Sequence, residues 1–300
     1  MHRTWLAVVA LFAAGCASPS ALPSGWLLAA DAEEGLAQDL PPVEVKERRI
    51  SEEEPVGANR QPEWTTQRRF ARSRVYVLAP GQIEAEAWYR GKYDARETGD
   101  QLYQGEIGIG LPHRFQIDYY QNFTDAPGAG VQDIGPQIEG RWAFAEWGRM
   151  FANPTAYLEY KWDDTGADKY EAKLLLGDTL APRWHGAANL IVEQQTSGDR
   201  ETELGVSTAL SYSIIDGKLG VGAEFTVSRI SGAGFRDDAA WEVALGPSVQ
   251  WRFTERAHLD VVPMFGLNRD THDVDLFVVL GYDFGGPDGG AFAPTSTKSR

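Results

Sequence analysis

The feature that most constrains this chain is a two-residue alternation in its last long stretch, residues 241–284. From Trp241 to Phe253, apolar side chains occupy every second position, and the positions between them are polar or small. Residues 259–267 and 274–284 repeat the pattern. Successive side chains of a β-strand point to opposite faces, so each run predicts a strand with one apolar face. Each run has about ten residues, the length that a tilted strand needs to cross a bilayer.

The same period recurs upstream. It predicts about twelve strands, at residues 82–92, 101–111, 115–123, 131–144, 155–162, 168–177, 183–195, 201–213, 218–228, 241–253, 259–267 and 274–284. Short links such as residues 111–114 alternate with longer polar links such as residues 229–240. Short periplasmic turns opposite longer external loops, with an even number of strands, are typical of outer-membrane barrels. An even number also places both chain termini in the periplasm.

Aromatic residues of the apolar faces gather near the strand ends. Trp142 and Trp251 belong to the short-turn side, and Tyr103 and Trp162 to the loop side. Rings at both interfaces with aliphatic residues between them are typical of membrane barrels. We therefore predict an all-β fold: a transmembrane, antiparallel, up-and-down β-barrel of about twelve strands in a bacterial outer membrane, with its apolar rows facing lipid.

A soluble fold would produce the same alternation. A periplasmic β-barrel that binds a small apolar ligand, or a β-sandwich, would turn the apolar rows inward. Neither would account for two aromatic bands or for the many charges on the opposite faces. The soluble, ligand-binding barrel is the second alternative.

The N-terminus resembles a bacterial export signal, and the predicted outer-membrane barrel indicates a Gram-negative source. Arg3 precedes a short apolar core in residues 1–16. The segment ends in Ala13-Ala14-Gly15-Cys16, which resembles a lipobox and makes Cys16, the only cysteine, a candidate lipidation site. Ordinary signal cleavage is the alternative. After residue 14, no apolar run reaches the roughly 18 residues of a membrane helix.

The rest of the chain divides into three segments. Residues 17–74 have no sustained period and predict a disordered periplasmic tail, residues 75–285 form the barrel, and residues 286–300 form a C-terminal tail. Four arginines, at positions 68, 69, 72 and 74, precede the first strand. They are either a solvated segment near anionic headgroups or, as a hypothesis, a small gate that docks in an acidic periplasmic mouth.

The inward-facing positions carry many charges, and acids outnumber bases. The predicted pore-lining residues are Glu84, Glu86, Glu106, Asp118, Glu139, Arg141, Glu171, Glu224, Arg252 and Asp260. Buried charges must be paired or hydrated. The interior is therefore either a water-filled acidic pore that favours cations or a closed core of ion pairs. Barrels of about eight strands are filled by side chains and those of about sixteen contain a channel, so both interiors remain open.

Composition and motifs argue against other functions. The formal net charge of −15 disfavours a nucleic-acid partner. The sequence has no His-x-x-x-His zinc spacing, no Gly-x-Ser-x-Gly elbow and no phosphate-binding glycine loop, so we expect no enzyme activity and no cofactor. Acidic external loops such as residues 163–164 are either a plain solvated surface or a site for divalent cations that bridge lipopolysaccharide.

Residues 75–285 resemble bacterial outer-membrane barrels of about twelve strands, and most closely the outer-membrane transporters of the meta-pathway (phenol degradation) type. The resemblance rests on residues 105–111, 133–137 and 280–284. It implies passive passage of small molecules. We expect a cation-preferring channel for small solutes; the first alternative is a non-conducting structural or adhesive barrel. The expected partners are outer-membrane lipid, lipopolysaccharide, the outer-membrane assembly machinery and small-molecule solutes.

Overall fold

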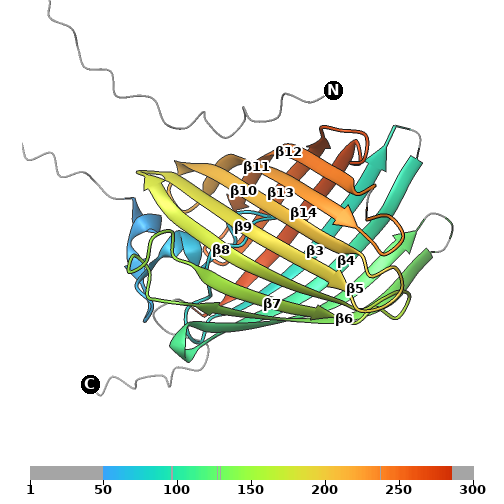
Figure 1. The fold of residues 1–300 in the computed structure, drawn as a ribbon. Helices are drawn as coiled ribbons and strands as arrows, with labels where there is room; N and C mark the ends of the chain where they lie inside the picture. The colour runs from blue at the N-terminus through green and yellow to red at the C-terminus, as the bar shows by residue number, and fades with distance from the viewer. Residues whose placement is uncertain (1–49, 96, 127, 129, 237, 286–300) are drawn as a thin grey trace, which may run out of the picture. The chain divides into compact units, whose positions relative to one another are not determined.

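A computed structural model describes residues 50–285, except residues 96, 127, 129 and 237. Twelve strands form one closed antiparallel barrel, in which sequence neighbours pair and β14 closes onto β3 (Figure 1). They are β3 Ile83–Asp94, β4 Glu97–Leu111, β5 Phe115–Ala126, β6 Gly130–Ala143, β7 Thr155–Lys161, β8 Lys169–Ala181, β9 Trp184–Gln195, β10 Thr202–Ile215, β11 Leu219–Ser231, β12 Ala240–Arg252, β13 Ala257–Gly266 and β14 Val274–Phe284. The predicted all-β barrel of about twelve strands is confirmed.

The apolar rows of the strands face outward. In β12, Trp241, Leu245 and Trp251 are 50%, 44% and 51% exposed, whereas Ala244 and Gln250 are buried. A soluble protein rarely exposes an apolar surface of this extent, and a bilayer covers it. This orientation is the opposite of what the soluble, ligand-binding alternative requires. Among the described residues, no helix is long and apolar enough to cross a membrane.

Aromatic rings pair on the outer surface at both ends of the barrel. At the short-turn end, ring centroids are 5.0 to 5.9 Å apart in the pairs Phe115–Trp142, Trp184–Tyr212 and Trp251–Phe253. At the loop end, the pairs Tyr89–Tyr103 and Tyr160–Trp162 are separated by 5.5 and 4.8 Å. These two bands agree with the predicted interfacial girdles.

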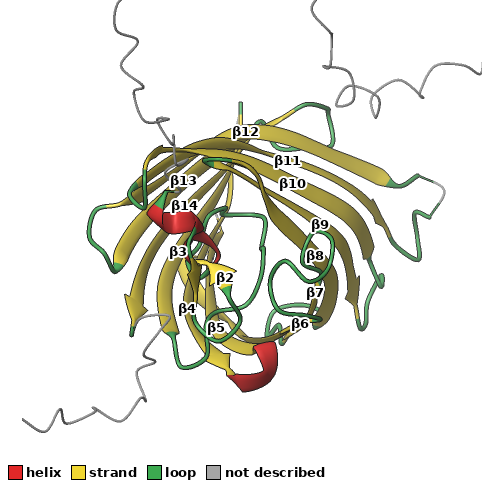
Figure 2. Cartoon of the chain, turned by 90° about the vertical axis from the view of Figure 1, so that its left-hand side faces the viewer, coloured by secondary structure: helices red, strands yellow, loops and turns green. Residues whose placement is uncertain are grey.

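The segment before the first barrel strand folds inside the barrel at its short-turn end. This segment, residues 50–79, is called the plug below (Figure 2). It contains two short 3-10 helices, η1 (Ser51–Glu53) and η2 (Glu63–Thr65), and the two-stranded pair β1 (Pro55–Val56) and β2 (Gln61–Pro62). A third 3-10 helix, η3 (Pro112–Arg114), forms the turn between β4 and β5.

The structure differs from the sequence prediction over part of the tail. Residues 17–74 were predicted to be disordered, but residues 50–74 are folded, with Trp64 and Phe70 almost fully buried. The physical reason is that a twelve-stranded wall encloses more space than its own side chains fill, so another segment of the chain occupies it. The predicted export signal, Cys16, the remainder of the tail and the C-terminal tail at 286–300 lie outside the described residues.

The end of the plug runs against the barrel wall. Gly81 donates its backbone N–H to the carbonyl of Gly110 in β4 at 2.8 Å. A Cβ atom at Gly110 would collide with the backbone carbonyl of Ala79. Glycine is therefore required at position 110 of β4, beside which the chain passes from the plug into β3.

An outward-facing charge tests the orientation of the strands. Leu245 lies midway along β12, and an arginine there would face hydrocarbon. We expect Leu245→Arg to lower the free energy of unfolding by about 2–4 kcal/mol in lipid vesicles, measured by denaturant titration. The control, Leu267→Arg, sits just beyond β13 at the loop end and should cost about 0–1 kcal/mol. Equal losses at both positions would contradict the membrane-facing assignment.

Candidate functional site

Two carboxylates of the wall face each other where the plug docks. Glu86 in β3 and Glu106 in β4 are direct partners in the strand register, and both are buried. Like charges opposite each other destabilise a sheet unless a cation lies between them. The guanidinium of Arg68 supplies that cation: it pairs with Glu86, and its Nη2 lies 3.3 Å from Glu106. It also lies over the ring of Trp88, 4.2 Å from the centroid.

Three more plug arginines bind the wall, and one of them, Arg72, lies 3.4 Å from Asp275 of β14. The Nη2 of Arg74 lies 3.0 Å from Glu106 and donates to the Tyr120 hydroxyl at 2.9 Å. Arg69 pairs with Glu52 of the plug at 3.3 Å and donates to Ser211 in β10 at 2.9 Å. Burial lowers the pKa of the Arg69 guanidinium from its ordinary value. The predicted docking of the arginine segment in an acidic mouth agrees with these contacts.

The plug backbone is also held by wall side chains. The carboxylate of Glu224 in β11 accepts the backbone N–H groups of Ala71, Arg72 and Ser73 at 2.9, 3.0 and 3.2 Å. The side-chain amide of Asn189 in β9 bonds both the N–H and the carbonyl of Arg74, each at 2.8 Å. A carboxylate that accepts several backbone donors is a strong, directional anchor.

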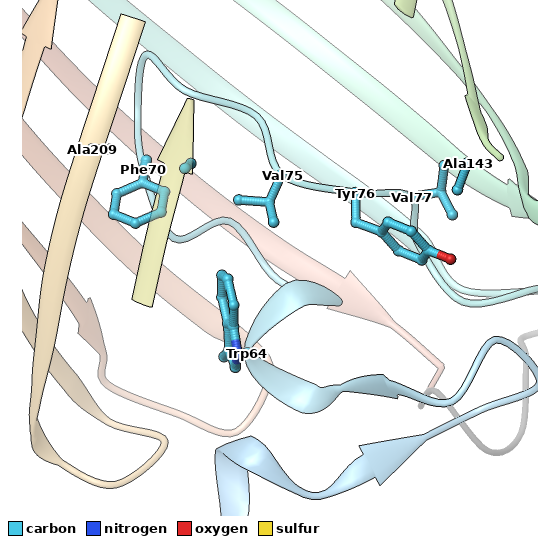
Figure 3. Close-up of a cluster of buried hydrophobic side chains, with 8 residues drawn as sticks. Trp64, Phe70, Val75, Tyr76, Val77, Ala143 and Ala209 are labelled. Carbon is cyan, nitrogen blue, oxygen red and sulfur yellow. The ribbon is translucent and has the colours of Figure 1, made fainter. Parts of the chain in front are cut away.

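Apolar packing completes the docking of the plug. Figure 3 shows its ring and aliphatic side chains in a buried cluster near the barrel wall. The cluster comprises Trp64, Phe70, Val75, Tyr76 and Val77 of the plug and Ala143, Ala187 and Ala209 of the wall. The wall residues are alanines, which leave room for the large plug side chains.

The long link between β6 and β7 covers this cluster. Trp147, in that link, makes edge-to-face contacts with Trp64 and Tyr76, with centroids 5.8 and 5.3 Å apart. The Tyr76 hydroxyl donates to the Ala145 carbonyl at 2.5 Å, and burial raises the pKa of Tyr76 to about 12. The hydroxyl therefore stays protonated and donates at neutral pH. This link is the long exception among the short turns because it packs on the plug.

A row of carboxylates crosses six neighbouring strands. Successive register partners from β5 to β10 are Asp118, Glu139, Glu159, Glu171, Glu193 and Glu203. Basic side chains interrupt the repulsion: Arg141 pairs with Glu139 and lies 3.7 Å from Asp118, and Lys173 lies 2.7 Å from Glu171. This acid row runs from the buried region beside the plug toward the loop end of the barrel.

An open cavity of about 310 Å³ lies between the plug and the loop end. Its lining has nearly balanced charge, with six bases and five acids: Arg72, Arg74, Arg90, Lys161, Lys169 and Lys173, and Glu159, Glu171, Glu193, Glu203 and Glu242. Trp88, Tyr157 and Phe277 add aromatic surface. The cavity therefore offers both ionic and apolar contacts to a small solute.

Of the ten predicted pore-lining residues, Glu171 alone lines this cavity. Glu86, Glu106 and Glu224 bind the plug, and the other six lie in buried clusters: Glu84 and Asp260 beside His258, Arg252 beside Asp283, and Asp118, Glu139 and Arg141 together. All ten belong to the interior side of the wall, where the alternation predicts them. Whether they line a conducting pore remains a prediction.

Sequence reasoning missed two features of the interior. The first is the plug, although the apolar run Val75–Ala79 was a signal for a buried segment. The second is an inward-facing apolar patch in which Val262, Met264, Phe277 and Val279 of β13 and β14 pack with Ala71 of the plug. Both strands contain continuous apolar runs, which indicate that both of their faces are apolar.

A known protein family matches the second half of this barrel. The family model described as the MetA pathway of phenol degradation matches residues 157–276, from β7 to β14. The predicted resemblance to this family is confirmed. No curated protein matches the chain.

Solved structures of outer-membrane channels share the fold of this barrel. An outer membrane channel from Pseudomonas putida F1 superposes with a TM-score of 0.52 and 13% identity, covering 70% of this chain and 98% of that one. The NanC porin superposes with a TM-score of 0.50 and 9% identity, covering 67% and 98%. At these identities the likeness concerns the fold alone.

Removing the Glu224 anchor tests the docking of the plug. We expect Glu224→Ala to expose the backbone N–H groups of residues 71–73, because their charged acceptor is lost. A hydrogen bond to a charged group contributes about 1.5–3 kcal/mol, so amide exchange in this segment should accelerate roughly ten- to hundredfold, measured by mass spectrometry. Glu201→Ala, at a carboxylate that contacts Gln195 at the loop end, is the control. Unchanged exchange in Glu224→Ala would contradict the anchor.

Proposed function

We propose that this protein is a bacterial outer-membrane channel for the passive passage of small solutes, closed at rest by its own plug. The acid row carries the proposal, because it connects the region beside the plug with the open cavity at the loop end. The outward apolar rows support a membrane location. In this arrangement the short turns, the plug and both termini face the periplasm.

Passage requires displacement of the plug. The cavity ends at plug residues, among them Ala71, Arg72 and Arg74. A solute that enters from the loop end meets mixed charges and the rings of Trp88 and Phe277 first. It then faces the plug, which is held by ion pairs, backbone anchors and apolar packing. Partial release of these contacts opens a route along the acid row.

We also propose that the open channel prefers cations. With the plug in place, its arginines neutralise Glu86 and Glu106, and Glu224 is occupied by backbone donors. When the plug leaves, these carboxylates lose their partners and the wall becomes acidic. An acidic wall around a narrow pore attracts cations and repels anions. The preference therefore belongs to the open state.

The alternative function is a non-conducting barrel with a structural or adhesive role. The observation that favours it is the number of contacts that hold the plug, which include ion pairs of both Arg68 and Arg74 with Glu106. Export by residues 1–16, lipidation at Cys16 and insertion by the outer-membrane assembly machinery belong to either proposal. So does contact with lipopolysaccharide. Neither alternative requires an enzyme activity.

Deleting the plug tests the closed state. We expect a variant that lacks residues 50–79 to show larger stable conductance steps than the wild type in planar bilayers. A salt gradient should give this variant a cation-preferring reversal potential, because the wall acids have lost their arginines. A variant that lacks residues 17–49 keeps the plug and should behave as the wild type. Identical conductance and open probability with and without residues 50–79 would exclude the plug as the gate.

A disulfide between plug and wall tests the same idea without removing any segment. The hydroxyl oxygens of Ser73 in the plug and Ser207 in β10 lie 3.0 Å apart, so cysteines at both positions are close enough to bridge. In a Cys16→Ser background, we expect the oxidised Ser73→Cys/Ser207→Cys protein to lose its conductance steps and to regain them after reduction. The Cys16→Ser protein alone should be insensitive to reductant. Silence of all forms, before and after reduction, would favour the non-conducting alternative.

A further inference from the structure

Three strands at the barrel closure place a histidine beside two glutamates. The register pairs His258 in β13 with Gly281 in β14, and Gly281 with Glu86 in β3. Glu84 lies two residues before Glu86, on the same inward face. The three side chains are fully buried, and one ligand atom from each lies within 4.8 Å of the others.

The polar atoms of this cluster converge without bonding one another. The Nε2 atom of His258 lies 3.6 Å from Oε1 of Glu86 and 3.9 Å from Oε1 of Glu84, beyond hydrogen-bond distance. Within the described part of the chain, Nε2 of His258 and Oε1 of Glu84 have no hydrogen-bond partner. Buried polar atoms are rarely left unpaired, so atoms of this kind call for a ligand.

The surroundings orient the imidazole toward the glutamates. Its Nδ1 atom bonds Oδ2 of Asp260 at 2.7 Å, which directs Nε2 at the two carboxylates. Metal-binding histidines commonly have such a carboxylate partner on their second nitrogen. Gly281 leaves the space that the ring occupies, since a Cβ atom there would collide with Nε2. The arrangement thus depends on a glycine, an aspartate and the strand register together.

We propose that Glu84, Glu86 and His258 form a binding site for one divalent transition-metal ion, with Zn²⁺ as the best match. One imidazole nitrogen and two carboxylate oxygens form a donor set that zinc accepts in proteins. A tetrahedral site with bonds of about 2.0–2.2 Å separates its ligand atoms by about 3.3–3.6 Å. The observed separations from Nε2, 3.6 and 3.9 Å, need a contraction of a few tenths of an ångström at most.

Space for a fourth ligand lies beside Glu84. Glu84 lines a cavity of about 30 Å³ between the plug and the wall, together with Arg68 and Gln116. A volume of this size holds a water molecule, which would reach the ion from the Glu84 side as the fourth ligand of a three-residue zinc site. The negative charge of the two carboxylates, increased by Asp260, offsets the loss of hydration of the ion.

The site is linked to the plug through Glu86. This carboxylate is paired with Arg68, so a bound cation and the guanidinium compete for the same group. Metal binding and docking of Arg68 therefore oppose each other. The site itself stands on the geometry of the wall and does not depend on conduction through the barrel.

Metal analysis of the untagged full-length protein, folded in detergent micelles, tests the site. After removal of metal by a chelator and dialysis against Zn²⁺, we expect the wild type to retain one ion per barrel more than His258→Asn. His113→Gln, which changes an exposed turn histidine, is the control and should bind as the wild type. Arg68→Gln should bind Zn²⁺ roughly tenfold more tightly or better, because a competing charge is removed.

Two results would overturn the site. One is a wild type that binds no more Zn²⁺ than His258→Asn, which would make the cluster an ion pair of a protonated imidazole. The other comes from X-ray absorption at the zinc edge of the wild type, which needs no variant to fold. We expect one imidazole and otherwise oxygen neighbours; sulfur, or more than one imidazole, would place the ion elsewhere.

Discussion

Glu86 and Glu106 lie directly opposite each other on neighbouring strands, buried inside the barrel where the plug docks. A cation between two desolvated carboxylates at such a position offsets their repulsion. Arg68 and Arg74 provide it from a segment that precedes the barrel in the chain. The pairing therefore links the β3–β4 part of the wall to the position of the plug in one interaction.

The wall and the plug are complementary in shape as well as in charge. Ala143, Ala187 and Ala209 face inward where Trp64 and Phe70 of the plug need space. On another part of the wall, the middle of the inward face of β13 and β14 is apolar and packs with Ala71. Because both halves of the interior bury apolar surface against the plug, hydrophobic stabilisation adds to the ion pairs. Displacement of the plug must overcome both contributions.

Beyond the plug, the interior changes character. The acid row is interrupted by Arg141 and Lys173, and the open cavity has nearly balanced charge. Aromatic rings such as Trp88 lie beside these charges. A cavity with this lining suits small solutes that combine polar and apolar parts. The electrostatic character of the wall depends on whether the plug is docked, because the plug supplies much of the positive charge near the closed end.

The sequence by itself determined the barrel: the alternation in β12, the number of strands, the outward row from Trp241 to Trp251 and the inward side of every predicted acid. These follow from a local rule, since neighbouring side chains of a strand point to opposite faces. Only the tertiary structure decided which acids meet. Strand register placed Glu86 opposite Glu106 and aligned His258, Gly281 and Glu86. Docking of the plug brought residues 50–79 into the lumen. Register and docking depend on contacts between residues far apart in the chain, and no local period encodes such contacts.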